Sequence, residues 1–305
     1  MKFSKYSKFF RFFGIALFIY ILSRIDVYGL IAAFREISAG YYLLAILFLI
    51  FGFLIRTLKW KRLITSIGAK ISAKDLFEIM IKATFLGVVT PGKLGEFWRA
   101  KYLADSGPIS NGSAFYTAFM DRLIDLLVLG LVAIPGLLII YLRFNVGAGW
   151  QLYILIFTIF IFLFFVFLKK IGLQKIFKMF VKEKNNIFLA EFDAGLSGLK
   201  MRLFLEILIY GFLYYLASVL ILYFTALALS ITVPFWYLFL VAALVLLILT
   251  LPLTFFGLGV REAGFIYFFS MLGISPPLTV AFSLLGLFSY ILISLPGAIL
   301  FLKQK

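Results

Sequence analysis

The chain lacks both cysteine and histidine throughout its 305 residues. The absence of cysteine excludes disulfides, thiolate nucleophiles and iron–sulfur clusters, and the absence of histidine excludes Ser-His-Asp triads, haem–histidine ligation and Cys/His zinc sites. Any function must therefore come from carboxylates, basic side chains, hydroxyl groups, backbone dipoles and shape. We expect no metal site and no cofactor.

Acidic residues are also scarce, with 13 Asp and Glu against 29 Lys and Arg and a formal net charge of +16. The chain is 64% hydrophobic, whereas soluble domains are about 45–50% apolar. So apolar a chain has too little polar surface to cover a soluble globule. The excess positive charge is therefore interpreted by its position relative to a membrane, and no nucleic-acid partner is expected.

Six apolar segments approach the length needed to cross a bilayer, which is about 20 residues. They lie at about 9–23, 41–58, 123–142, 150–168, 206–231 and 279–302. The first could be a signal peptide, but Arg24 and Asp26 follow it without a small-x-small cleavage site, so a retained helix is favoured. The sequence predicts an all-α integral membrane protein in which residues 1–305 form a single polytopic domain.

Basic residues gather in four stretches, which the positive-inside rule places in the cytoplasm. These stretches are 2–11, 56–74, 169–202 and 303–305. Both termini are then cytoplasmic, in the inner membrane of the cell. The linker at about 169–203 is interpreted as an amphipathic helix on the anionic leaflet.

Two further apolar segments, 76–104 and 235–275, must each start and finish on one side of the membrane if this orientation holds. Each is broken near its middle, at Thr90–Glu96 and at Leu251–Gly259, by proline and glycine. We predict two re-entrant helical hairpins in addition to the six spans.

The two breaks share a spacing, since Thr90-x-x-x-Leu94-Gly95 matches Thr254-x-x-x-Leu258-Gly259. The order span, hairpin, span recurs in two halves, at about 41–142 and 206–302, which point in opposite directions. Such inverted repeats are typical of secondary transporters, whose sites lie at broken helices. The alternative is a chance recurrence in a chain rich in leucine and glycine.

Charges within apolar segments are informative because each costs about 2.5–3.5 kcal/mol on insertion scales. At the first break, Lys93 and a helix N-terminus suit a phosphate, and Glu96 and Arg99 can pair because they are three residues apart. The alternative is a structural ion pair that stabilises the hairpin.

A second group of charges is Asp121-Arg122-x-x-Asp125, in which the two acids share a helix face and Arg122 can pair with Asp125. These residues could bridge to the basic residues at the breaks or couple protons. The alternative for Asp121 is a helix start favoured by the dipole. Arg261 and Glu262 follow the second break, and Lys82 is expected to snorkel.

Three motifs in this order resemble the lysylphosphatidylglycerol synthase transmembrane-region family. They are the segment Thr90–Glu96 with Arg99 and Leu103, then Asp121-Arg122-x-x-Asp125, then Pro252 with Gly257–Glu262. Asp121 stands where the family more often has Glu, and Phe255-Phe256-Gly257 replaces a Pro-Gly-Gly pattern. The family forms the flippase half of bacterial multiple peptide resistance factor proteins and the membrane part of some archaeal dolichol-linked glycosyltransferases.

The resemblance implies that a phospholipid or a polyprenyl-phosphate-linked lipid is moved between leaflets. It does not imply lysyl transfer, because that reaction belongs to a soluble domain of the fused relatives, for which the chain leaves no room after Lys305. The expected partner is a membrane lipid with an anionic headgroup or a phosphate, and a homo-oligomer stays open. The residues assigned to substrate binding are Thr90, Pro91, Gly92, Lys93, Gly95, Glu96, Arg99, Asp121, Arg122, Asp125, Gly257, Gly259, Arg261 and Glu262.

In this interpretation the basic residues contact phosphate, and the carboxylates pair with them, accept a cationic headgroup or couple protons. No G-x-x-x-x-G-K-[ST] motif for ATP is present, so transport is passive, ion-coupled or driven by a partner. Two other functions compete with transport: a membrane enzyme acting on lipid phosphates, and a non-transporting membrane scaffold.

The first hairpin can be tested by cysteine labelling, for which the cysteine-free chain gives no background. Asp75→Cys and Asp105→Cys should both react with a membrane-impermeant maleimide from the cytoplasmic side. Ala148→Cys, in a loop predicted outside, should react only from the other side. Reaction of positions 75 and 105 from opposite sides would refute the hairpin.

Overall fold

The computed structural model describes residues 3–107, 109–144, 186–250 and 257–303, and every regular element in these ranges is a helix. This confirms the all-α class. The predicted span at 150–168, most of the linker at 169–203 and residues 251–256 of the second break lie outside the described ranges. The described helices are α1 (Phe3–Arg24), α2 (Val27–Arg35), α3 (Ala39–Ser66), α4 (Ala73–Val88), the 3-10 helix η1 (Pro91–Phe97), α5 (Trp98–Asp105), α6 (Asn111–Phe144), α9 (Asn186–Ser197), α10 (Met201–Ala228), α11 (Phe235–Leu249), α12 (Val260–Ser270) and α13 (Pro276–Leu302).

Four of the described helices, α3, α6, α10 and α13, are long and apolar enough to cross a membrane. They coincide with the predicted segments at 41–58, 123–142, 206–231 and 279–302. The helices extend beyond most of these segments because a helix does not end where its hydrophobicity does. In α6 the polar first part adds residues from Asn111 onward.

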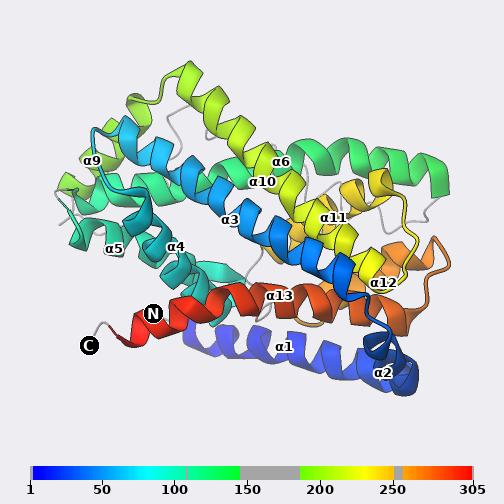
Figure 1. Cartoon of the computed structure of the whole chain (residues 1–305). Helices are drawn as coiled ribbons and strands as arrows, with labels where there is room; N and C mark the ends of the chain where they lie inside the picture. The colour runs from blue at the N-terminus through cyan, green and yellow to red at the C-terminus, as the bar shows by residue number, and fades with distance from the viewer. Residues whose placement is uncertain (1–2, 108, 145–185, 251–256, 304–305) are drawn as a thin grey trace.

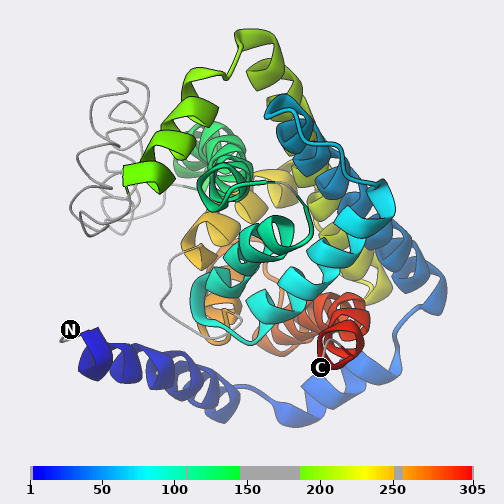
Figure 2. The ribbon, with the colours of Figure 1, turned by 90° about the vertical axis from the view of Figure 1, so that its left-hand side faces the viewer.

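The first predicted span, 9–23, lies within the single helix α1. The part of α1 from Phe13 to Arg24 meets α2 at 91°, and these two helices pass the length and composition test for a span when taken together. Asp26 caps α2, with its side chain accepting a hydrogen bond of 3.0 Å from the backbone N–H of Tyr28. Figure 2 shows α1 running along the outside of the bundle.

The most extensive contact between two of the described helices is that of α3 with α10. Figure 1 shows the two helices running side by side in opposite directions. They meet at small residues, since a Cβ built on Gly52 would lie 3.2 Å from the Cβ of Ala217. Small residues let membrane helices approach closely, so this crossing ties the two halves of the chain together.

The halves also pack crosswise. α4 of the first half packs on α13 of the second, and α11 of the second packs on α6 of the first. Each long helix carries a Pro-Gly pair at its contact. A Cβ on Gly297 would collide with the backbone carbonyl of Ile81 in α4, and one on Gly136 would lie 3.2 Å from the Cβ of Leu240 in α11.

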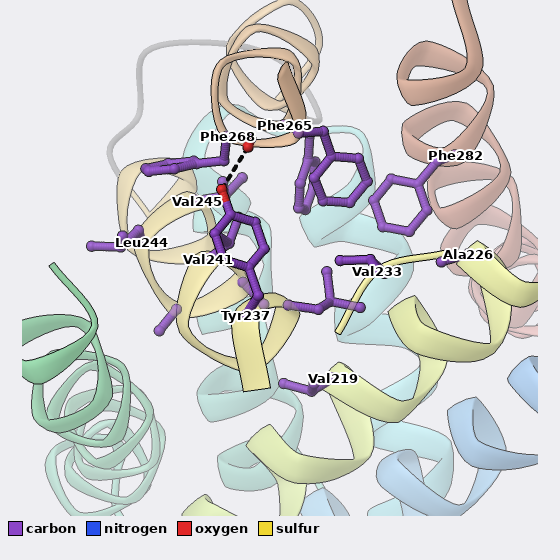
Figure 3. Close-up of a cluster of buried hydrophobic side chains, with 14 of the residues drawn as sticks. Val219, Ala226, Val233, Tyr237, Val241, Leu244, Val245, Phe265, Phe268 and Phe282 are labelled. Carbon is purple, nitrogen blue, oxygen red and sulfur yellow. Dashed lines mark hydrogen bonds between the residues drawn. The ribbon is translucent and has the colours of Figure 1, made fainter. Parts of the chain in front are cut away.

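Two hydrophobic cores fill the bundle. One joins α10, α11, α12 and α13 with the second part of α6, and Figure 3 shows its side chains converging on α11. The only hydrogen bond drawn there runs 2.5 Å from the Tyr237 hydroxyl to the Phe268 carbonyl. The other core joins α3, α4, α5 and α9 with the first part of α6. The buried charged residues Arg56, Lys59, Arg99 and Asp121 lie on helices of this second core.

The two segments predicted to form hairpins each begin with a described helix that is too short to span. α4 has 16 residues and α11 has 15, whereas a span needs about 20. The chain leaves α4 at Val89 and continues through η1 into the short helix α5. These short segments lie against the long helices of the opposite half.

Candidate site: a buried cluster of charges

Glu96 is the point at which several helices meet. It belongs to η1, and its carboxylate pairs with Arg56 of α3 and with Arg122 of α6. The hydroxyl of Tyr290 in α13 donates a third hydrogen bond, of 3.1 Å, to the Glu96 carboxylate. The hydroxyl must be the donor because an ionised carboxylate can only accept. The Glu96 side chain is only 2% exposed. One carboxylate thus joins three long helices to the break.

A glycine in α4 makes room for this carboxylate. A Cβ on Gly87 would meet the Glu96 side chain at closer than van der Waals distance. Any larger residue at position 87 would therefore push Glu96 out of reach of its two arginines.

Asp121 forms a second junction one layer away. Its two carboxylate oxygens lie 3.0 Å from the Nζ of Lys59 and 2.7 Å from the NH1 of Arg99. Lys59 also pairs with Asp125, one helical turn further along α6. Arg99 donates another hydrogen bond, of 2.9 Å, to the Ala118 carbonyl. Asp121, Lys59 and Arg99 are almost completely buried.

Aromatic rings line the cluster. The Tyr214 ring of α10 lies 5.7 Å from the guanidinium of Arg56 and 5.8 Å from the Nζ of Lys59. The Trp60 ring lies 5.1 Å from the guanidinium of Arg99. Cations over ring faces gain attraction that grows when water is excluded, so these rings stabilise charges for which carboxylates are too few.

Lys93 differs from the other basic residues of the site in its backbone conformation and in having no carboxylate close to it among the described residues. Its backbone has φ 58°, in the left-handed region that costs a non-glycine residue free energy. Its Nζ lies 4.5 Å from the centre of the Tyr290 ring, and among the described residues no carboxylate lies within 4.0 Å of it. The side chains of Lys93 and Arg122 are partly exposed, and that of Arg122 is 24% exposed. These two cations form the accessible edge of the cluster.

We define the charged cluster as the ionised side chains joined by these contacts. Its members are Arg56, Lys59, Lys93, Arg99 and Arg122 together with Glu96, Asp121 and Asp125. Five positive charges therefore stand against three negative ones.

The first break is closed by Thr90 and Gly95. The Thr90 hydroxyl donates to the Leu86 carbonyl at 2.7 Å and accepts from the Gly95 N–H at 2.7 Å. A Cβ on Gly95 would collide with that same carbonyl. The Gly95 N–H is thus already hydrogen-bonded within the break. Pro91 and Gly92 form the first turn of η1.

The second break carries a smaller group of charges. Gly257 and Gly259 have φ 73° and 80°, which suit glycine. Glu262 accepts a 2.6 Å hydrogen bond from the Gly259 N–H. It also accepts one of 2.6 Å from Ser283 and pairs at 3.0 Å with Arg261. Arg261 and Glu262 thus neutralise each other at the start of α12.

Two predicted ion pairs are wrong. Glu96 pairs with Arg56 and Arg122 rather than with Arg99, and Arg122 pairs with Glu96 rather than with Asp125. The predicted bridge from Asp121 to Arg99 is confirmed. Residue spacing predicts only pairs within one helix. In the observed pairs the partner belongs to another helix, so its position depends on how the helices pack.

Two predictions about position are also corrected. Asp121 is not at a helix start, because α6 begins ten residues earlier at Asn111 and Asp121 is fully buried. Arg56 and Lys59 were predicted to mark the cytoplasmic side, but both are buried in the cluster. Lys82 is likewise only 8% exposed, against α13.

The sequence analysis missed four residues of the site, namely Arg56, Lys59, Tyr214 and Tyr290. A signal for the first two is present. Seven of the ten buried residues of α3 follow a helical spacing along one face, at 52, 53, 56, 59, 60, 63 and 64, and both basic residues are among them. Neighbouring Lys61 and Arg62 are off that face. Nothing in the sequence singles out the two tyrosines among 16.

A groove of about 740 Å³ lies on another side of η1, between α5, α6 and α9. Its lining includes Leu94, Phe97 and Phe188, and Lys101 at its edge has its Nζ 5.3 Å from the Trp98 ring. Lys101 is exposed and makes none of the contacts that define the charged cluster. It provides a matched control for substitutions of the cluster's lysine and arginine residues.

The helices and the buried charges define a multi-pass membrane protein with a polar site inside its helix bundle. The chain belongs to the lysylphosphatidylglycerol synthase transmembrane-region family, whose model matches residues 9–297. It is also similar to a UPF0104 membrane protein of Methanocaldococcus jannaschii, with 27% identity over 94% of this chain and 93% of the relative. The family predicted from the three motifs is thus confirmed.

The buried junctions should matter for stability far more than surface ion pairs. Asp121→Ala leaves the Arg99 guanidinium buried without a carboxylate, so it should lower the free energy of unfolding by about 3–5 kcal/mol. Glu206→Ala removes an exposed pair with Arg62, at 2.5 Å, and should cost at most about 1 kcal/mol. Denaturant unfolding in micelles measures both, and equal costs would contradict the assigned burial.

Proposed function

We propose that the protein moves a phosphate-bearing lipid, a phospholipid or a polyprenyl-phosphate-linked lipid, from one membrane leaflet to the other. The observation that carries this proposal is the charged cluster, which lies among α3, α6, α10 and α13 beside a helix break. Buried membrane charges are costly and mark substrate or ion pathways. Lys93 and Arg122 at its accessible edge suit a phosphate.

The proposed transport path uses the two halves as an inverted repeat with two re-entrant hairpins. Three features support this arrangement. The hairpin helix of each half packs on the last long helix of the other, and α3 meets α10 at Gly52 and Ala217. In addition, α6 and α13 run in opposite directions, as α3 and α10 do (Figure 1). In such repeats, rocking of one half against the other alternates access to a central site.

The orientation follows from the basic stretches. We propose that the protein lies in the cell membrane with both termini in the cytoplasm. The end of α3 at Ser66 and the start of α6 at Asn111 would then face the cytoplasm, and with them the half of the bundle that holds the charged cluster. A lipid would enter the site from the cytoplasmic leaflet or leave to it.

Two other functions compete with transport. A membrane enzyme acting on lipid phosphates would need carboxylates free to hold a divalent cation. Here Glu96, Asp121 and Asp125 are each paired with basic side chains, and within the described ranges no three acidic residues form a metal-ligand group. We therefore propose a non-enzymatic role. A scaffold would have no use for cations at an accessible edge.

Reconstitution in vesicles with a fluorescent phospholipid tests transport. The wild type should exchange the lipid between leaflets, measured by quenching the outer leaflet with a membrane-impermeant reductant. Arg122→Gln should slow exchange at least tenfold, because it removes a partly exposed cation from the edge of the cluster. Lys101→Gln makes the same change of charge outside the cluster and should leave exchange unchanged.

Two outcomes would contradict the proposal. Metal-dependent breakdown of the lipid without exchange would favour the enzyme. Absence of both exchange and breakdown, in protein that unfolds at its normal temperature, would favour the scaffold.

A further inference from the structure

The charge balance of the cluster restricts what its ligand can be. The three carboxylates are all shared or already used: Glu96 binds two arginines, Asp121 binds Lys59 and Arg99, and Asp125 binds Lys59 again. Three negative charges neutralise three of the five positive ones. Two positive charges remain without a counter-charge among the described residues.

Charge without a counter-charge is unfavourable among membrane helices. The rings of Tyr214, Trp60 and Tyr290 offset part of this cost. They cannot neutralise it, because an aromatic ring carries no net charge. The surplus therefore attracts anions and repels cations at the accessible edge.

Unused hydrogen-bond donors lie in the same cluster. The Nε atoms of Arg56 and Arg99 are buried and have no hydrogen-bond partner among the described residues. Lys93, with its ammonium over the Tyr290 ring, donates to no described carboxylate. A donor without an acceptor is unfavourable, and Lys93, at the accessible edge of the cluster, is free to donate to a ligand oxygen.

We propose that this site selects a doubly negative phosphate group, a phosphomonoester or a diphosphate, over a singly negative phosphodiester and over a cationic aminoacyl headgroup. This proposal rests on the proposed function and specifies its substrate class. Two negative charges match the surplus of two. A phosphodiester would leave one positive charge over, and an aminoacyl headgroup would add another.

Lys93 is the specificity-determining residue in this proposal. Arg56 and Arg122 share Glu96, whereas Lys93 has no described carboxylate partner. Its left-handed backbone holds it at the edge of the cluster, where a ligand can reach it. Removal of its charge lowers the surplus from two to one, which is the charge that a phosphodiester matches.

The test compares two lipids that differ by one methyl group and one negative charge. Nanodiscs at pH 8 would contain equal amounts of phosphatidic acid, a phosphomonoester, and phosphatidylmethanol, a phosphodiester. Native mass spectrometry would count each lipid bound to the protein. We expect at least a tenfold preference for phosphatidic acid in the wild type. Lys93→Gln should reduce the preference at least fivefold, and Lys93→Arg should restore it.

Lys101→Gln, outside the cluster, should keep the preference. A preference that is absent in the wild type, or unchanged in Lys93→Gln, would overturn the proposal. Unfolding temperatures of the variants show whether the fold is kept, and Lys93 has no ion pair whose loss would unfold it.

A second arm distinguishes a lipid from a free anion. Inorganic phosphate at millimolar concentration should not displace phosphatidic acid if the site takes a lipid headgroup. If it does, the doubly negative phosphate chemistry stands and the source is soluble. Preference without leaflet exchange would refute the proposed function alone, and exchange of both lipids at equal rates and without preference would refute this inference alone.

Discussion

The carboxylate of Glu96 is the constraint on which the rest of the site depends. It holds Arg56 of α3 and Arg122 of α6 and accepts a hydrogen bond from Tyr290 of α13. Three long helices and the first break are therefore fixed by one side chain of a short 3-10 helix. Because Gly87 in α4 has no side chain, there is space for the Glu96 side chain. Movement of η1 would change all of these contacts together.

A single carboxylate, that of Glu96, cannot neutralise two guanidinium groups, whereas Asp121 and Asp125 together balance Lys59 and Arg99. Acidic residues are scarce throughout the chain, and the charged cluster keeps a net positive charge. The core around α11 that Figure 3 shows is made of apolar side chains, and the charges beside it, Arg261 and Glu262, pair with each other. The proposed ligand site therefore lies at the accessible edge of the charged cluster.

Composition and periodicity predicted the membrane class, four of the long helices and both positions at which shorter helices follow one another. They also predicted Glu96, Arg99, Asp121, Arg122 and Asp125 as residues of one site, and the structure brings them together with Lys93. The long helices were predictable because hydrophobicity is a property of each local segment of the sequence. The role of these residues in binding stays a prediction.

The partners of these residues could not be predicted in the same way. Arg56 and Lys59 follow an apolar run, where basic residues ordinarily mark the cytoplasmic side. Only the helical spacing of the buried face of α3 distinguishes them from Lys61 and Arg62. Tyr290 lies 194 residues from Glu96, and no spacing rule reaches so far. The ion pairs are decided by how the helices pack.

The central claim is that a phosphate group occupies the accessible edge of the charged cluster. A density map of the protein in nanodiscs that contain phosphatidic acid tests it most directly. The account predicts phosphate density in contact with the Nζ of Lys93 and the guanidinium of Arg122, with Glu96 still held by Arg56. A map that shows both cations surrounded only by protein and water, with the lipid phosphates elsewhere, would contradict it.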